Sequence, residues 1–192
     1  LMNIITRPYG STFCCCRPDT TWERENRDFY SPECVNAIFW TPVIFARISK
    51  AGKCIGERFA ERYYDGFNFG ALLYCLPGPE MTSADIAFAS CIDHTSLLPM
   101  PLYNPAVNSI DDNIFEVFSD GRPLYDCNSG TKMKALLEET ICKASELTSL
   151  RIGDFIVAEL ERPVLLASRS EGDSELKAVF CGNDLFTNKI IF

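Results

Sequence analysis

The sequence predicts an α+β fold that is rich in strands and contains one long helix. In residues 39–50 apolar, aromatic and β-branched side chains dominate, and a turn at Lys50–Lys53 follows, a pattern typical of a strand. Between residues 133 and 147, small and apolar side chains recur at helical spacing and predict one buried helical stripe. Asp-Gly within Ser119–Arg122, between two strand-like runs, indicates a hairpin.

The other elements are weaker and shorter. A Gly153–Asp154 turn is expected to precede a strand, and glycines near residues 172 and 182 separate the last strands. A proline-containing segment at 76–108 is expected to be irregular, apart from a short helix at 81–91. Strands are expected at residues 2–6, 12–16, 114–118, 124–126, 176–180 and 185–191.

The expected strand at 39–50 has two faces and one proline. Side chains alternate along a strand, so Thr41, Val43 and Phe45 share one face. Pro42 has no N–H to donate to a neighbouring strand, and we therefore expect an edge or a bulge at that position.

Composition and charge limit the classes of function. With 192 residues, 47% of them hydrophobic, the chain is expected to form a single domain spanning 1–192. A net charge of −8 and the lack of a basic run argue against nucleic acid or an anionic membrane as a partner. We expect Met2 to be the native start and, since no secretion signal or membrane-spanning stretch is visible, a cytoplasmic protein.

Ten cysteines and one histidine leave few candidates for a metal or nucleophilic site. The cysteines have irregular spacing and no C-x-x-C, so we favour free, buried thiols over a disulfide framework, including those of Cys14–Cys16. Cys91 lies three residues before His94, which would permit a thiol–imidazole pair, but a loop histidine without a role is the favoured interpretation.

Glu57, Glu61 and Asp65 are spaced for one acidic helical stripe. Arg58 and Arg62 lie among them, which favours a solvated, ion-paired face over a displaced metal site.

Several motifs together resemble the fumarylacetoacetate hydrolase family, especially its short bacterial members. They are Arg47–Lys53, which reads Arg-Ile-Ser-Lys-x-Gly-Lys, then Arg62–Asp65 and, upstream, Arg17–Thr20, which is similar to the Lys-Pro-Asp-Thr of those members. The resemblance spans nearly the whole chain. It implies a mixed-sheet α+β fold with one long helix and short lid helices, metal-dependent cleavage or isomerisation of keto acids, and a homodimer.

The same resemblance implies that the metal ligands of the family are replaced. In the family, a His-Tyr-Glu-x-Glu strand and a later aspartate hold one divalent metal. The glutamate positions fall at Thr41 and Val43, the aspartate position at about Leu72, and the histidine position at Phe39. None of these side chains can bind Mg²⁺ or Mn²⁺ as those carboxylates would, so we expect no metal and no other cofactor.

Other family positions are also altered. A Lys-x-Phe-Asp motif, whose lysine helps to hold the substrate carboxylate, matches Ser90 and Asp93, so that only the aspartate is kept. A Thr-Gly-Thr-Pro loop that contacts the substrate falls at residues 158–161. Arg47 is expected to form a buried or half-buried ion pair, although together with Lys50, Phe39 and Ser90 it could line a pocket. Six aromatic residues around the former site are expected to fill a core rather than line a ligand pocket: Phe39, Trp40, Phe45, Phe67, Phe69 and Tyr74.

The sequence therefore favours a non-catalytic member of the family, a pseudoenzyme retained for ligand binding or for protein association. The expected partners are a small carboxylate ligand and a second copy of the chain. The alternative is a diverged, metal-independent hydrolase or decarboxylase that acts on a small keto acid through Asp93, His94 or a cysteine.

Overall fold

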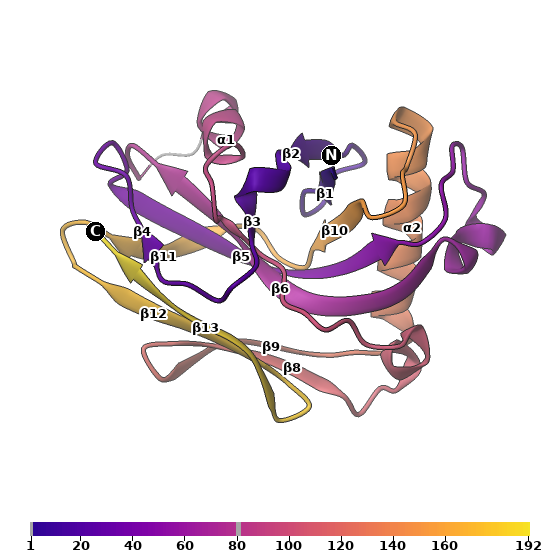
Figure 1. Ribbon diagram of the computed structural model, residues 1–192. Coiled ribbons are helices and arrows are strands. Elements are labelled where there is room, and N and C mark those ends of the chain that lie inside the picture. The colour runs from indigo at the N-terminus through magenta and orange to yellow at the C-terminus, as the bar shows by residue number, and fades with distance from the viewer. Residues whose placement is uncertain (1, 80–81) are drawn as a thin grey trace.

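Two β-sheets and one long helix make up most of the molecule (Figure 1). The computed structural model describes residues 2–79 and 82–192. The helices are α1 (Ser83–Ala89) and α2 (Thr131–Leu147), with short 3-10 helices η1 (Asp19–Thr21), η2 (Glu57–Arg62) and η3 (Pro105–Ser109). The large sheet consists of β1 (Ile4–Arg7), β2 (Cys15–Arg17), β3 (Trp22–Glu23), β5 (Ala37–Ile48), β6 (Tyr64–Leu76), β7 (Ser96–Leu97), β10 (Phe155–Glu159) and β11 (Val164–Ser168). The small sheet consists of β4 (Phe29–Tyr30), β8 (Ile114–Ser119), β9 (Arg122–Asn128), β12 (Ser174–Phe180) and β13 (Asn183–Ile191).

Both sheets are mixed. In the large sheet the strand order is β2-β1-β10-β5-β6-β7-β3, and β11 also pairs with β5. β1 with β10, β3 with β7, and β13 with β4 run parallel, whereas every other pair is antiparallel. Strands 12 and 13 residues long, β5 and β6, form the centre. The expected mixed-sheet α+β fold is confirmed.

The large sheet is strongly curled, because the short link between its two end strands could not span a flat sheet. The strands at the two ends of the order are β2, which ends at Arg17, and β3, which begins at Trp22. Five residue steps span at most about 17 Å. A flat sheet would place these strands about 29 Å apart, at about 4.8 Å for each of six spacings. The sheet must therefore bend, and one of its faces becomes an enclosed, concave surface.

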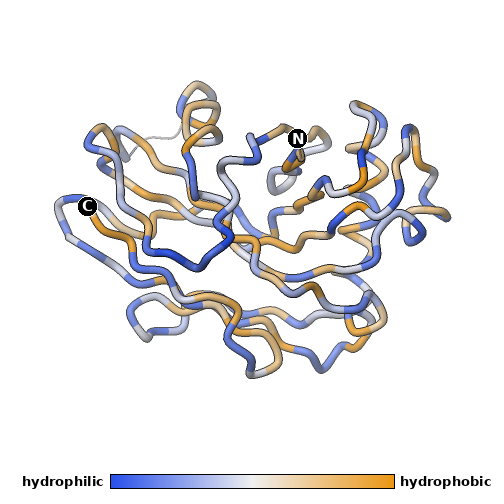
Figure 2. Tube along the Cα trace, viewed as in Figure 1, coloured by the Kyte–Doolittle hydropathy of each residue, from blue (hydrophilic) through white to orange (hydrophobic). Residues whose placement is uncertain are grey.

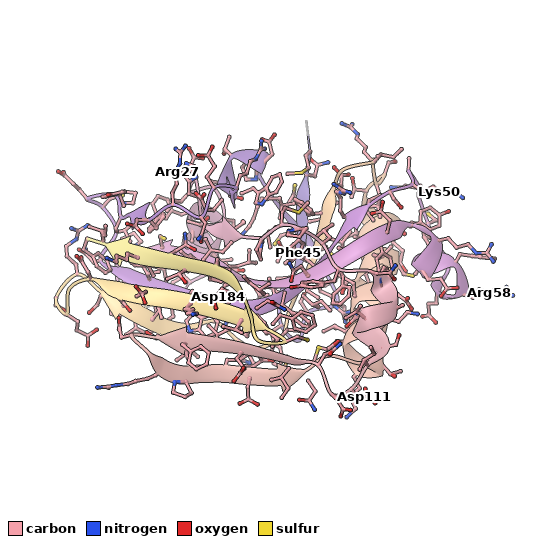
Figure 3. The ribbon with its side chains drawn as sticks, turned by 60° about the horizontal axis from the view of Figure 1, so that its bottom comes forward. Arg27, Phe45, Lys50, Arg58, Asp111 and Asp184 are labelled. Atoms are coloured by element: carbon pink, nitrogen blue, oxygen red, sulfur yellow. The ribbon has the colours of Figure 1, made fainter. Side chains whose placement is uncertain are left out.

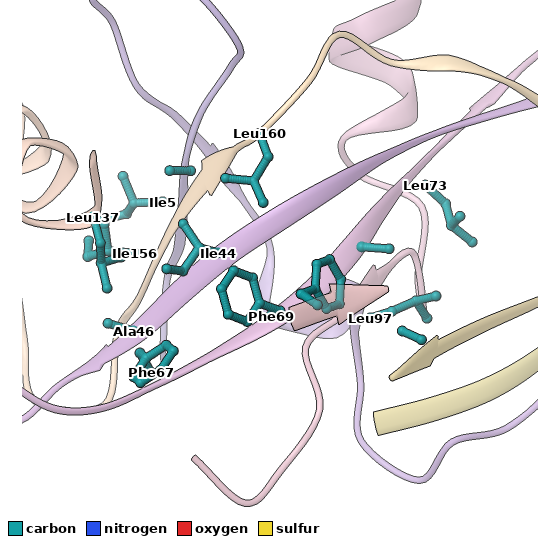
Figure 4. Packing of buried hydrophobic residues seen from close by; sticks show 14 of the residues in the cluster. Ile5, Ile44, Ala46, Phe67, Phe69, Leu73, Leu97, Leu137, Ile156 and Leu160 are labelled. Carbon is teal, nitrogen blue, oxygen red and sulfur yellow. The ribbon is translucent and has the colours of Figure 1, made fainter. Parts of the chain in front are cut away.

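The main core lies on the convex side of the large sheet. There Ile44, Ala46, Phe67 and Phe69 pack against the small sheet, and Leu137 of α2 joins the same cluster (Figure 4). Phe69 stacks on Phe115 of β8, with ring centroids 4.7 Å apart. In Figure 2, apolar colouring follows the central strands, while the segment between β3 and β4 is strongly hydrophilic.

Most of the elements predicted from the sequence form where expected. The hairpin joins β8 and β9 through Asp120 and Gly121, which both have positive φ (49° and 74°). Left-handed backbone at both turn positions matches the right-handed twist of the strands, and this is why Asp-Gly predicts such turns. The expected short helix at 81–91 is α1, although residue 81 lies outside the described part of the chain.

The expectation of an edge or a bulge at Pro42 is wrong. β5 is a central strand, and Pro42 pairs directly with Ala71 of β6. On its other side, β10 pairs with β5 up to Val43 and β11 only from Trp40 onwards. The proline therefore lies at the gap between these two neighbours, where no strand requires its missing N–H, and its carbonyl accepts a hydrogen bond from Leu160 N at 2.9 Å.

Among the described residues, no helix combines the length and apolar character needed to cross a bilayer.

Candidate functional site

The concave side of the large sheet carries the positions that the sequence marks as a former metal site. Thr41 is paired with Leu72 on the adjacent strand, and Val43 lies two residues along on the same face. On the other side of β5, Val43 is paired with Glu159 of β10. We refer to this surface, formed by Thr41, Val43, Leu72, Tyr74 and Glu159 with their neighbours on the same side, as the Thr41 face.

The Thr41 face is closed. Thr41, Val43 and Leu72 have no exposed surface at all. Val43 and Leu72 belong to an apolar cluster with residues of β1, β10 and α1, and Phe39 packs against its margin, partly buried. The Thr41 hydroxyl donates a hydrogen bond of 2.6 Å to the carbonyl of Glu161. The only hydroxyl among the three positions is thus already engaged with the backbone.

A guanidinium group lies inside the curled sheet. Arg17 is completely buried, and it donates to the carbonyl of Leu73 at 2.9 Å and to the hydroxyl of Ser96 at 3.2 Å. It also donates to the carbonyl and the hydroxyl of Thr95, both at 3.3 Å. Ser96 is the β7 partner of Leu72, so this permanent cation lies beside one of the positions that the resemblance assigns to a metal ligand.

Tyr74 connects Arg17 to a buried carboxylate. The Arg17 guanidinium lies 4.7 Å from the centre of the Tyr74 ring, and the Tyr74 hydroxyl donates a short hydrogen bond to Glu159. The second oxygen of that carboxylate accepts a 2.9 Å hydrogen bond from Tyr9 N. Burial raises the pKa of Glu159 above its ordinary value, while the bonds from Tyr74 and Tyr9 and the charge of Arg17 act in the opposite direction.

This pKa shift predicts how the stability contribution of Glu159 depends on pH. A carboxyl group with a raised pKa binds its proton more tightly in the folded state, so ionising it costs stability. Relative to a Glu159→Gln variant, the wild-type protein is expected to lose stability as the pH rises from about 4.3, the ordinary glutamate value, through the raised pKa of the folded protein. Urea unfolding of both proteins across this range measures the difference. A wild-type advantage that grows with pH would show that Arg17 and the two hydrogen bonds outweigh burial.

The side chains on the Thr41 face do not fit a divalent metal. Of the three positions that the resemblance assigns to metal ligands, two are aliphatic, and the hydroxyl at the third donates to a carbonyl. Glu159 is the one carboxylate paired with them, and within residues 2–79 and 82–192 no group of three or more potential metal ligands gathers anywhere. Hard divalent cations require several oxygen ligands at once, which this face cannot provide.

Asp93 and His94 lie elsewhere, at the margin of an open cleft of about 890 Å³. His94 has positive φ (61°), and its Nδ1 contacts the carboxylate of Glu23 at 2.8 Å. The Glu23 side chain is only 5% exposed and also accepts from the backbone N–H groups of Glu25 and Arg27. Ser90 ends α1, and its hydroxyl donates to Ile86 O at 2.7 Å. None of these contacts reaches the Thr41 face.

The cysteines are free, but fewer are buried than expected. All ten are unpaired thiols, and only Cys75 and Cys142 are fully buried. Cys16 is exposed, because β2 is an edge strand that pairs only with β1. Cys91 lines the same cleft as His94, but its thiol is directed to Ala87 O at 3.6 Å.

Arg47 was expected to form a buried or half-buried ion pair, and the expected burial is wrong. Its side chain is 44% exposed and makes a 3.9 Å contact with Asp65 across the β5–β6 pair. Asp65 belongs to β6 rather than to η2, so Glu57, Glu61 and Asp65 do not form one helical stripe. All three are exposed, and Glu61 contacts Lys134 at 3.6 Å, which agrees with the favoured interpretation of a solvated surface.

The six aromatic residues of the central strands fill cores and do not line one common pocket. Tyr74 and the buried Phe45 point to the Thr41 face, with Phe39 at its margin. Trp40, Phe67 and Phe69 point to the convex side and belong to the main core. This division follows from the alternation of side chains along β5 and β6.

Comparison of the whole structure with solved structures gives close matches in fold. A protein from Yersinia pestis CO92 that is assigned to the fumarylacetoacetate hydrolase family matches with a TM-score of 0.74 at 14% identity, over 100% of this chain and 93% of that chain. The chain has the fumarylacetoacetate hydrolase fold. The 5-carboxymethyl-2-hydroxymuconate delta-isomerase from Mycobacterium smegmatis matches with a TM-score of 0.78 at 12% identity, over 98% of this chain and 78% of that chain. The fumarylpyruvate hydrolase from Pseudomonas aeruginosa, solved with Mn²⁺ and pyruvate, matches with a TM-score of 0.69 at 15% identity, over 100% and 89%.

Sequence comparison gives no match. No protein-family model and no curated protein sequence matches the chain. The fumarylacetoacetate hydrolase fold is thus retained although sequence identity to these solved structures is only 12–15%.

Sequence reasoning missed the most distinctive residues of the site. The sequence marks Arg17 only as part of a motif, and Tyr74 only as one aromatic among six. It marks Glu159 only as one position of the segment 158–161. A clue was present in the pattern, because Glu159 is a charged residue in the otherwise apolar run Phe155–Leu160, and a charge inside a buried strand requires a partner.

Proposed function

We propose that this chain is a fumarylacetoacetate hydrolase homologue without metal-dependent catalysis, retained for binding. The observation that carries the proposal is the closed Thr41 face, where apolar packing and the Thr41–Glu161 hydrogen bond occupy the former ligand positions. The buried guanidinium of Arg17 adds a second obstacle, since its positive charge lies beside Leu72, on Ser96, and would repel a cation there. Without a Lewis acid, a 1,3-dicarbonyl substrate is not polarised for cleavage.

An activity assay tests this proposal directly. We expect that Mg²⁺ or Mn²⁺ will not raise the rate of acylpyruvate hydrolysis or of oxaloacetate decarboxylation above the rate of the same metal in buffer. The purified protein should be assayed with each metal and again after addition of a chelator. Turnover that needs the metal and disappears with the chelator would contradict the proposal.

A metal-independent enzyme remains the second candidate, because one observation favours it. Glu23 contacts the imidazole of His94 at 2.8 Å, which is the arrangement of a carboxylate that orients a general base, and Cys91 and Asp93 line the same 890 Å³ cleft. Keto acid turnover that resists chelation and is lost in His94→Gln would favour this candidate. A His94→Gln variant that leaves any such rate unchanged would remove it.

The expected partners are proposals at this stage. A homodimer is proposed on the resemblance alone, and light scattering at micromolar concentration measures the mass that decides it. A small carboxylate ligand, a keto acid included, is unfavourable in the cleft beside His94, because Glu23, Asp28 and Asp93 line it and Arg27 is already paired with Glu25. This acidic lining is the reason that the metal-independent enzyme is placed second. An anionic ligand would need a different surface.

A further inference from the structure

The segment around η2 carries positive charge on an acidic protein. Residues 47–62 contain five basic and two acidic residues, a net charge of +3, whereas the whole chain has a net charge of −8. Lys50 and Arg58 project from the same end of the molecule (Figure 3). A local patch opposite in sign to the rest of a protein attracts ligands of the opposite charge.

Most of these cations have no carboxylate partner. Arg47 contacts Asp65, and Glu61 contacts Lys134, so these groups are already engaged. For Lys50, Lys53, Arg58 and Arg62, no carboxylate among the described residues lies within 4.0 Å. Their charges are therefore available to a ligand from solution.

A hollow of about 540 Å³ lies within this patch. Lys53 and Arg58 line it together with the rings of Phe59 and Tyr63, and Glu57 is the one carboxylate on its wall. Its size is within the range of about 300–1,000 Å³ that small-molecule sites occupy. We call it the Lys53–Arg58 hollow.

Aromatic rings hold further cations at its rim. The guanidinium groups of Arg58 and Arg62 each lie 5.4 Å from the centre of the Phe59 ring, which is 42% exposed. The ammonium of Lys50 lies 5.2 Å from the centre of the Tyr63 ring. Such contacts restrict the cations without neutralising them, because a ring face carries no net charge.

The floor of the hollow is fixed to the rest of the fold. Cys54 N donates to Ser145 O at 2.9 Å, and the Lys53 ammonium donates to Leu147 O at 3.2 Å, both at the end of α2. Tyr63 packs so closely on Gly52 that a Cβ there would lie 2.4 Å from the ring. A site held in place before its ligand arrives loses less entropy on binding.

We propose that the Lys53–Arg58 hollow is a binding site for a small multivalent anion, either a phosphate compound or a polycarboxylate. At least two unpaired cations face the hollow and two more stand at its rim, so a ligand with two or three negative charges complements it best. This site lies apart from the Thr41 face, and the inference does not depend on the loss of metal catalysis.

Titration calorimetry at low ionic strength tests the proposal, with inorganic pyrophosphate and citrate as the two probes. We expect saturable binding of at least one probe, and the comparison of the two assigns the phosphate or the carboxylate source. A Lys53→Gln/Arg58→Gln double variant should bind roughly tenfold more weakly or worse. Lys53→Arg/Arg58→Lys, which keeps both charges, should retain most of the affinity.

A matched control separates a site from general charge attraction. Lys177→Gln removes an exposed cation of the small sheet that is already paired with Asp184 at 2.9 Å, and it should leave the affinity unchanged. All of these positions are on the surface, so the variants should fold. The proposal is overturned if neither probe binds saturably, or if the double variant and the Lys177→Gln control bind as the wild type does.

Discussion

Replacing Arg17 with methionine is expected to lower the free energy of unfolding by about 3–5 kcal/mol, because several hydrogen bonds to a buried charged group, each worth about 1.5–3 kcal/mol, are lost together. The guanidinium is completely buried and donates to Leu73 O, to Ser96 Oγ and to both oxygens of Thr95. Methionine would remove all four of these hydrogen bonds, although Thr95 O would still accept from Leu73 N and Ser96 Oγ would keep its bond with Thr21 Oγ1. It would also remove the positive charge that acts to lower the pKa of the buried Glu159. Urea unfolding measures the change.

A surface arginine with similar contacts provides the control. Arg169 donates to the carbonyls of Pro32 and Val35 at about 3 Å but is only half-buried, so water can replace its hydrogen bonds. Arg169→Met should therefore cost much less than Arg17→Met. Equal losses for the two variants would show that the buried Arg17 network has no special role in the fold.

Restoring carboxylates to the Thr41 face is expected to make the protein unstable without metal and responsive to metal. Thr41→Glu, Val43→Glu and Leu72→Asp would place three carboxylates on one face, with Cβ atoms about 4.5–5.5 Å apart across the pair. Each would be buried, and like charges at this distance resist ionisation, so the melting temperature should fall. Mn²⁺ should recover part of the loss, because it neutralises the cluster and binds only the folded protein.

A neutral triple variant is the matched control for this experiment. Thr41→Gln, Val43→Gln and Leu72→Asn introduce side chains of nearly the same size that cannot provide a charged ligand set. This variant should also be destabilised, but Mn²⁺ should not raise its melting temperature. If the acidic and neutral variants respond alike to Mn²⁺, these three positions are not the former ligand set.

The sequence predicted an element well where the residues of that element alone determine its backbone conformation. Asp120-Gly121 demands a left-handed turn, and the stripe on residues 133–147 demands a helix with one buried side, and both form. Pro42 shows the limit of such reasoning. Proline has no N–H for a neighbouring strand, so a strand should not pair with it on that side. Such a gap occurs here in the middle of the sheet, between β10 and β11, and it can be seen only in the tertiary structure.

Only the part of the Thr41 face that depends on strand alternation and on the resemblance could be placed from the sequence. The sequence places Thr41 and Val43 on one face, and the resemblance adds Leu72; the structure pairs Leu72 directly with Thr41, 31 positions earlier in the chain. It could not place Arg17 beside them, because that contact depends on the curl that brings β2 near β7. It also could not predict that Arg47 would be exposed, since burial of a strand residue depends on which elements cover that end of the sheet.

Thermal melting of the wild-type protein with increasing Mn²⁺ tests the central claim most directly. A ligand raises the melting temperature only if it binds the folded state, and for a chain of this size each kcal/mol of stabilisation corresponds to about 2–4 °C. The closed Thr41 face predicts no change between chelator and millimolar Mn²⁺. A saturable rise of several degrees that the chelator abolishes would contradict the account, because it would show that a metal binds despite the loss of its carboxylates.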